Sequence, residues 1–203
     1  MAEANGTQGS RQYDSPVRRA QSAQTRERIV DAACALMHER SVRDWGAVTI
    51  RGVAHEAGVN ERTVYRYFTN ERGLRDAVMH RMESEAGIDL AGMQLADVAE
   101  VAARIFSYVS SFPFEPKAPL DPTLTEANLR QRDALHNALS EWTSSWPAED
   151  AAGAAAVLDV LWSVGAYERL TTDWQMDREQ AVRTLTWAIE LVAEAVRNGR
   201  RPG

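Results

Sequence analysis

Apolar residues recur at spacings of three and four along almost the whole chain, and no stretch alternates convincingly between polar and apolar. The first pattern gives a helix one apolar face, whereas a half-buried strand needs the second. The fold class that we predict is therefore all-α, with about nine helices and essentially no sheet. The sequence shows no internal repeat at the spacing of a helical solenoid.

Caps, prolines and apolar periodicity divide the chain into helices and loops. Residues 1–22 lack hydrophobic periodicity, so we expect a disordered arm there. The prolines within residues 113–122 forbid a continuous helix and predict a loop. Helices are predicted over 23–39, from the caps Thr49 and Asn60, from near Asn70, and over 95–109, 135–146, 149–170 and 177–198.

Composition restricts the class of protein and its location. The single cysteine, Cys34, excludes an intramolecular disulfide and a zinc site of several cysteines, and its place on an apolar helical face predicts core packing. The polar start lacks the apolar region of a secretory signal, and the most apolar later stretch is too short to span a membrane. We therefore expect a cytoplasmic protein that binds no membrane, no metal and no cofactor.

The net charge of −6 hides an asymmetry between the two ends of the chain. Residues 1–81 contain 13 arginines against 10 acidic residues, whereas residues 82–203 contain 10 basic residues against 19 acidic ones. A polyanion would be attracted to the first part and repelled by the second. The charge distribution thus favours nucleic-acid binding by the N-terminal part.

The segment TIRGVAHEAGVNERTVYRYF, residues 49–68, carries the most specific pattern. Ala54 is small enough for two short helices to cross closely, and Gly58 tolerates the left-handed backbone of a turn. Val64 can anchor the second helix on the first. These residue types at these offsets predict a helix-turn-helix.

The second helix of this pattern, ERTVYRYF, has a polar face. Arg62, Thr63 and Arg66 point away from its apolar anchors, as they must in a helix that enters a major groove. We therefore interpret this helix as the recognition helix.

The stretches RERIVDAACALMHER, VTIRGVAHEAGVNERTVYRYF and ERGLRDAV together resemble the DNA-binding domain of tetracycline-repressor (TetR) family regulators, over about Thr25 to Val78. The resemblance implies a bacterial, homodimeric, ligand-responsive regulator that binds a pseudo-palindromic double-stranded DNA operator. The residues that it implies at the DNA are Thr49, Arg51, Thr63, Tyr65 and Tyr67, with Arg62 and Arg66 as further candidates. Tyr67 and Thr49 are expected to hold phosphates, and Arg62 and Thr63 to reach base edges. Tyr65 and Phe68 alternatively contribute to the core.

Two positions depart from the family pattern. Glu71 stands where the family usually has a phosphate-binding lysine, with Arg72 adjacent. Either Arg72 takes over that phosphate contact or the contact is absent. Gly52 replaces the acidic residue usual near the start of the second helix, which weakens the capping of that helix.

Residues 23–81 are expected to form the DNA-binding domain, and the resemblance implies that residues 82–203 bind ligand and dimerise. We expect a four-helix dimer interface made by the last two helices of both copies, because a helix-turn-helix needs a two-fold partner to read two half-sites. The interface residues that we predict are Val157, Leu161, Val164, Gly165, Leu185, Ile189, Val192 and Val196.

Five of the six tryptophans lie after residue 140, which favours an aromatic-rich interior suited to an apolar or aromatic effector. These rings alternatively fill the core or the interface. The predicted pocket residues are Phe106, Val109, His136, Leu139, Trp142 and Trp162.

The function that we predict is a transcriptional regulator, most simply a repressor released from its operator by a small molecule. An enzyme is disfavoured because the four histidines show no metal-ligand spacing, and the chain has neither a glycine-rich phosphate loop nor a nucleophile elbow. A helical small-molecule carrier or protein-interaction module with decayed DNA binding is the alternative, supported only by Glu71.

Overall fold

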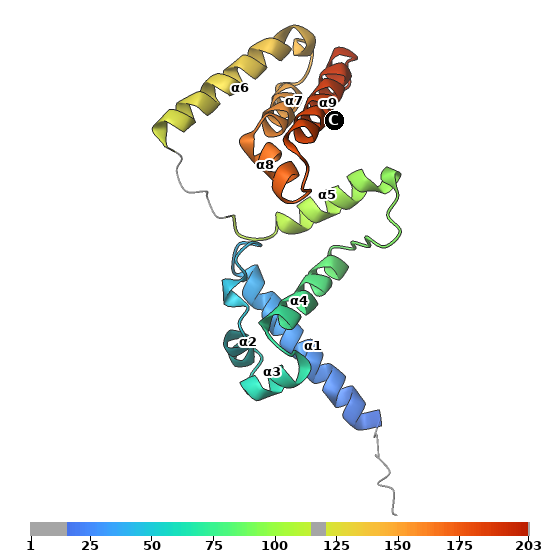
Figure 1. Ribbon diagram of the computed structural model, residues 1–203. Helices are drawn as coiled ribbons and strands as arrows, with labels where there is room; N and C mark the ends of the chain where they lie inside the picture. Colours follow the sequence, from blue (N-terminus) through green and yellow to red (C-terminus); the bar gives the residue numbers. More distant parts are fainter. Residues whose placement is uncertain (1–15, 115–120, 203) are drawn as a thin grey trace, which may run out of the picture. The chain divides into compact units, whose positions relative to one another are not determined.

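The computed structural model describes residues 16–114 and 121–202, and within these ranges it contains nine α-helices, two short 3-10 helices and no strand (Figure 1). The predicted all-α class and the number of helices are thereby confirmed. The chain divides into two compact units, residues 1–117 and 118–203. None of the described helices is both long and apolar enough to cross a membrane.

Three side-chain caps begin the helices of the first unit where the sequence predicted them. Thr49 accepts a hydrogen bond from the backbone N–H of Gly52, Asn60 from that of Arg62, and Asn70 from that of Gly73. The helices and 3-10 helices of this unit are α1 (Pro16–His38), η1 (Trp45–Ala47), α2 (Ile50–Glu56), α3 (Glu61–Tyr67), α4 (Glu71–Glu85), η2 (Leu95–Asp97) and α5 (Val98–Val109).

The first helix begins earlier than the sequence analysis predicted. Residues 16–22, which we placed in a disordered arm, form the first turns of α1. Proline at the first helical position loses no hydrogen bond, and the arginine, alanine and glutamine residues that follow it have high helix propensity. The remainder of the predicted arm, residues 1–15, lies outside the described residues.

The turn between α2 and α3 is a Schellman motif centred on Gly58. The backbone N–H of Val59 donates to the carbonyl oxygen of Ala54 at 2.9 Å, and the N–H of Gly58 donates to that of His55 at 3.1 Å. Gly58 has a φ of +63°, and Ala54 and Val64 are buried between the helices. The predicted roles of Ala54, Gly58 and Val64 are therefore confirmed.

Replacing Gly58 by alanine is expected to destabilise the protein by about 1–2 kcal/mol, because L-residues pay this cost for a left-handed backbone. No atom would touch the added methyl group, so the effect reports the backbone alone. Gly73→Ala is the matched control, because Gly73 lies inside α4 at a negative φ and its added methyl group meets only the Asn70 side chain at 3.8 Å. It should stabilise by about 0.5–1 kcal/mol. Urea unfolding measures both, and equal shifts of the two variants would contradict this account of the turn.

The core of the first unit joins α1 to the helix-turn-helix and to the end of α5. Its fully buried residues include Ile29, Val30 and Met37 of α1, Val53, Val64, Leu74 and Val78. Cys34 is buried in this core as predicted, and burial raises the pKa of its thiol to about 11. The thiol therefore stays protonated at neutral pH.

The compact first unit extends beyond the domain boundary that we predicted after residue 81. The ring of Phe112, just after α5, stacks on that of His38 at 4.5 Å and meets the ring of Tyr108 edge-on at 5.4 Å. Because Phe112 is buried in the same core as α1, α5 belongs to the first unit.

The second unit contains α6 (Pro122–Thr143), α7 (Ala148–Leu161), α8 (Val164–Thr172) and α9 (Arg178–Arg197). The prediction of a single helix over 149–170 is wrong, because Ser163 adopts an extended backbone between α7 and α8. The Ser163 hydroxyl accepts a hydrogen bond from the N–H of Ala166 at 3.1 Å and so caps the start of α8. The helix predicted over 135–146 begins earlier, because Asp121 caps it and Pro122 takes its first position. The buried core of the second unit is small and consists of Leu139, Ala154, Ala155, Leu158 and Val196.

Candidate functional site

The recognition helix α3 presents two distinct faces. Val64 is fully buried, and Phe68, directly after the helix, is buried in the same core. Tyr65 is 53% exposed, which answers the alternative that this ring belongs to the core. The outward face of α3 therefore consists of Arg62, Tyr65 and Arg66, with Thr63 half-buried beside them.

Tyr67, the last residue of α3, contacts the first turns of α1. Its hydroxyl oxygen accepts hydrogen bonds from Ser22 and from Arg66, each at 3.1 Å, and the Arg66 guanidinium also stands over its ring at 4.9 Å. The hydrogen bond from Ser22, followed by the hydrogen bond and the positive charge of Arg66, lowers the pKa of Tyr67.

A polar hollow of about 440 Å³ adjoins this tyrosine. It is lined by Arg18, Gln21, Ser22, Thr25, Arg66 and Tyr67. Arg18, Gln21 and Ser22 were not expected on a helix, because the lack of hydrophobic periodicity placed residues up to 22 in a disordered arm. Pro16 followed by residues of high helix propensity was the signal that could have found them.

Glu71 has a structural role that explains its departure from the family pattern. Its carboxylate accepts from the backbone N–H of Ile50, the first residue of α2, at 3.3 Å, and pairs with Arg75 at 3.5 Å. Arg75 in turn donates to the carbonyl oxygen of Val48 at 3.1 Å. Glu71 thus supplements the Thr49 cap of α2, while Arg72 is exposed beside it. The remaining predicted DNA contact, Arg51, is exposed on α2.

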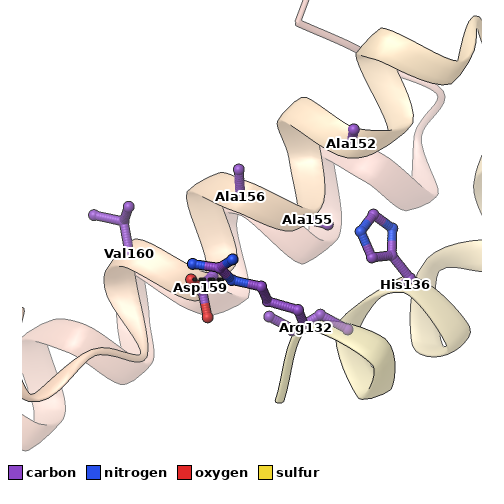
Figure 2. A pocket seen from close by; sticks show the side chains of 8 residues that line it. Arg132, His136, Ala152, Ala155, Ala156, Asp159 and Val160 are labelled. Carbon is purple, nitrogen blue, oxygen red and sulfur yellow. Dashed lines mark ion pairs between the residues drawn. The ribbon is translucent and has the colours of Figure 1, made fainter. Parts of the chain in front are cut away.

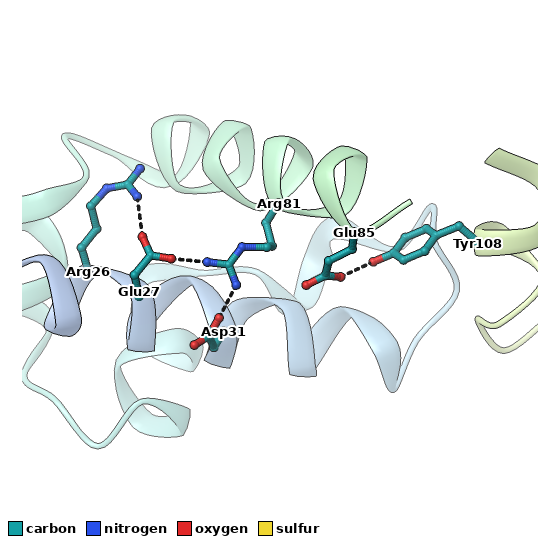
Figure 3. Close-up of polar contacts among 6 residues, drawn as sticks. All are labelled: Arg26, Glu27, Asp31, Arg81, Glu85 and Tyr108. Carbon is teal, nitrogen blue, oxygen red and sulfur yellow. Dashed lines mark hydrogen bonds and ion pairs between the residues drawn. The ribbon is translucent and has the colours of Figure 1, made fainter. Parts of the chain in front are cut away.

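Ion pairs hold α4 against α1 (Figure 3). The Arg81 guanidinium of α4 pairs with both Glu27 and Asp31 of α1, and its hydrogen bond to Asp31 raises the pKa of the guanidinium. One turn further along α4, Glu85 accepts from the Tyr108 hydroxyl of α5 at 2.7 Å. Burial raises the pKa of Tyr108, so this phenol remains a donor. α4 is therefore tied to both α1 and α5.

The six predicted pocket residues are divided between the two units of the fold. Phe106 and Val109 line a hollow of the first unit, and His136 lines a different one in the second unit. Leu139 is buried in the core, whereas Trp142 and Trp162 are about half exposed, at 46% and 56%. Among the described residues of the second unit, the buried core contains no aromatic ring and consists of Leu139, Ala154, Ala155, Leu158 and Val196, with Trp146 packed against it.

The hollow at His136 lies between α6 and α7 and has a volume of about 380 Å³ (Figure 2). Ala152, Ala155 and Ala156 leave the space on the α7 side. Its polar end is formed by Asp159, which accepts from Gln131 at 2.8 Å and pairs with Arg132 at 3.7 Å. The hollow thus combines small apolar walls with a few polar groups.

The predicted interface residues fall into three groups by exposure. Val157, Val164 and Gly165 are exposed. Leu161, Leu185, Ile189 and Val192 are half-buried. Val196 is buried in the core of its own unit, so its apolar character is explained without a partner.

The geometry of α2 and α3, a Schellman turn with a buried anchor and a cationic outward face, defines a helix-turn-helix protein. Residues 29–78 match the family model described as bacterial regulatory proteins, tetR family. Residues 29–78 therefore carry a TetR-type helix-turn-helix domain, similar to that of HTH-type transcriptional regulators.

Curated relatives are similar over the same region. Uncharacterized HTH-type transcriptional regulators from two strains of Mycobacterium tuberculosis are 33% identical over 85 residues, which cover 42% of this chain and 40% of each relative. The uncharacterized HTH-type transcriptional regulator YvkB of Bacillus subtilis is 36% identical over 63 residues, 31% of this chain and 32% of that protein. The chain thus matches less than half the length of these relatives. No solved structure matches significantly.

Proposed function

We propose that this chain is a homodimeric repressor that binds operator DNA through α3 and releases it when a small molecule binds the second unit. The observation that carries the proposal is the outward face of α3, where Arg62, Tyr65 and Arg66 are exposed. Val64, on the opposite face of the helix, is buried in the core. Cationic and hydroxyl groups on one helical face suit base edges and phosphates. Such a regulator acts in the cytoplasm, where bacterial DNA lies.

Phosphate contacts would flank this recognition face. The hydroxyl of Tyr67 and the guanidinium groups of Arg66 and Arg18 line one hollow, and this chemistry suits a phosphate oxygen. Arg72, at the start of α4, is the proposed phosphate contact there, because the Glu71 carboxylate is engaged by α2. Thr49 is half-buried and caps α2 through its hydroxyl, and we propose it as a further phosphate contact. Since Glu71 has this structural role, it no longer supports a carrier with decayed DNA binding.

Dimerisation is proposed through α7, α8 and α9. Exposed apolar side chains that have no cover within the unit lie on these helices: Val157, Val160, Val164, Val182, Trp187 and Leu191. A second copy is the occupant we propose, because operator reading requires two recognition helices about 34 Å apart.

The effector site that we propose is the hollow between α6 and α7. Its volume falls in the range of small-molecule sites, and His136 and Arg132 would orient a polar group of the ligand. The apolar walls favour an apolar or aromatic body.

Release of DNA requires that the ligand moves the recognition helices. α4 is the proposed lever, because Arg81 ties it to α1 and Glu85 ties it to α5. Changing the population of the DNA-binding state from 99% to 1% needs about 5.5 kcal/mol of differential ligand affinity.

The proposal is tested by fluorescence anisotropy of a labelled duplex from the DNA upstream of the chain's own gene. We expect tight binding that weakens by about 10³-fold or more between about 50 and 200 mM salt, and competition by unlabelled specific duplex but not by random duplex. Equal competition by both duplexes would contradict a sequence-specific regulator.

The variant Glu71→Lys tests the phosphate contact at the start of α4. It removes a carboxylate and adds a cation, so DNA affinity should rise and the plot of log K against log salt should steepen by about 0.9 for each subunit. Loss of the hydrogen bond from the Ile50 N–H to Glu71 should cost about 1 kcal/mol of stability. Asp76→Lys makes the same charge change along α4 and leaves that hydrogen bond in place. An unchanged salt slope for Glu71→Lys would show that no DNA phosphate lies near the start of α4.

A further inference from the structure

A second hollow of the first unit is used by none of the roles above. It has a volume of about 540 Å³ and lies between the loop that follows α1 and the end of α5. Its lining is mainly apolar, with Val42 on one side and Phe106, Val109, Phe112 and Phe114 on the other. Phe106 and Phe114 are well exposed, so the hollow is open to a ligand.

The one charged group of this lining is Arg43. Its guanidinium makes no hydrogen bond or ion pair with the residues that the structure describes. The neighbouring carboxylate of Asp44 is already engaged, because it accepts from the N–H of Gly46 at 3.0 Å and pairs with Arg40 at 3.4 Å. Arg43 is therefore an uncompensated cation at the rim of an aromatic hollow. This chemistry fits an amphipathic anion, whose apolar body enters the hollow while its carboxylate meets the guanidinium.

The hollow adjoins the parts of the fold that hold the helix-turn-helix. One wall is the loop that leads through η1 to Thr49, the cap of α2. The other wall includes Phe112, whose ring contacts His38 of α1 and Tyr108, and Tyr108 donates to Glu85 of α4. A ligand here would touch the supports of both α2 and α4.

We propose that this hollow is a binding site for a small amphipathic carboxylate and that its occupation weakens DNA binding. The site is separate from the hollow between α6 and α7 and needs no residue of the second unit. The regulatory half rests on the proposed function, whereas the binding half does not.

Isothermal titration of the full chain with sodium 2-naphthoate and with sodium decanoate tests the binding half. At least one acid should bind saturably with a Kd below about 1 mM, and 2-naphthamide, which lacks the charge, should bind about tenfold more weakly than 2-naphthoate. Arg43→Gln should weaken the acid about tenfold and leave the amide unchanged.

Two tryptophan substitutions locate the ligand. Val109→Trp fills this hollow and should abolish acid binding, whereas Val160→Trp fills the hollow between α6 and α7 and should leave it unchanged. Circular dichroism melting checks that both variants fold. If Val109→Trp does not fold, the affinities of Arg43→Gln for 2-naphthoate and 2-naphthamide still test whether the acid binds beside Arg43.

Failure of both acids to bind would overturn the proposal. It would also be overturned if Arg43→Gln left the acid affinity unchanged, or if Val160→Trp and not Val109→Trp abolished acid binding. The regulatory half is tested by repeating the DNA titration with saturating acid, which should lower operator affinity about tenfold in the wild type and not in Val109→Trp. DNA binding without acid tests the proposed function separately, so the two failures are distinguishable.

Discussion

Val64→Asp is expected to unfold the helix-turn-helix and to abolish DNA binding. Val64 of α3 is fully buried in the core of the first unit. The variant therefore loses apolar burial and places an unpaired carboxylate in this core. The expected loss of stability is about 4 kcal/mol or more. Urea unfolding followed by circular dichroism measures it.

Tyr65→Asp is the matched control for this variant. It puts the same residue one position later on the same helix, where the side chain is 53% exposed. The free energy of unfolding should change by less than about 0.5 kcal/mol, while DNA affinity should fall because a negative charge faces the phosphates. A folded Val64→Asp, or a Tyr65→Asp variant that unfolds, would reverse the inside and outside faces that we assign to α3.

Arg62→Ala is expected to weaken operator binding strongly and to relax base preference at one position of each half-site. A lost base contact costs about 1–3 kcal/mol, and a dimer loses this contact in both half-sites, so affinity should fall by between about 30-fold and 20,000-fold. Anisotropy titrations against the operator and single-base variants of it measure both effects.

Tyr67→Phe provides the contrast with Arg62→Ala. Because its hydroxyl is placed to donate to a phosphate, its loss should weaken specific and random duplexes by the same factor, with base preference unchanged. If Tyr67→Phe leaves affinity for every duplex intact, the phosphate contact is wrong.

The helix-turn-helix could be predicted from sequence because its determinants are local. Ala54, Gly58 and Val64 act through contacts within about twenty residues, and the Thr49 and Asn60 caps bond backbone groups two or three positions away. Local steric rules and hydrogen bonds of this kind can be read from the spacing of residue types.

The features that sequence reasoning missed depend on competition or on distant contacts. Ser163 lies within an apolar helical pattern, yet its hydroxyl caps a new helix and ends α7. The bond between Glu71 and Ile50 joins residues 21 positions apart, and no pattern of either segment announces it. Phe106 and His136 lie on helices of different units, so periodicity could place each on a helical face but not in a common pocket.

In vitro selection from a pool of random duplexes, with the full-length chain, tests directly whether the outward face of α3 reads DNA. We predict enrichment of an inverted repeat whose half-site centres are about 34 Å apart, and loss of that repeat for the double variant Arg62→Ala, Arg66→Ala. Enrichment of no sequence by the wild type, or of the same repeat by the double variant, would contradict the account.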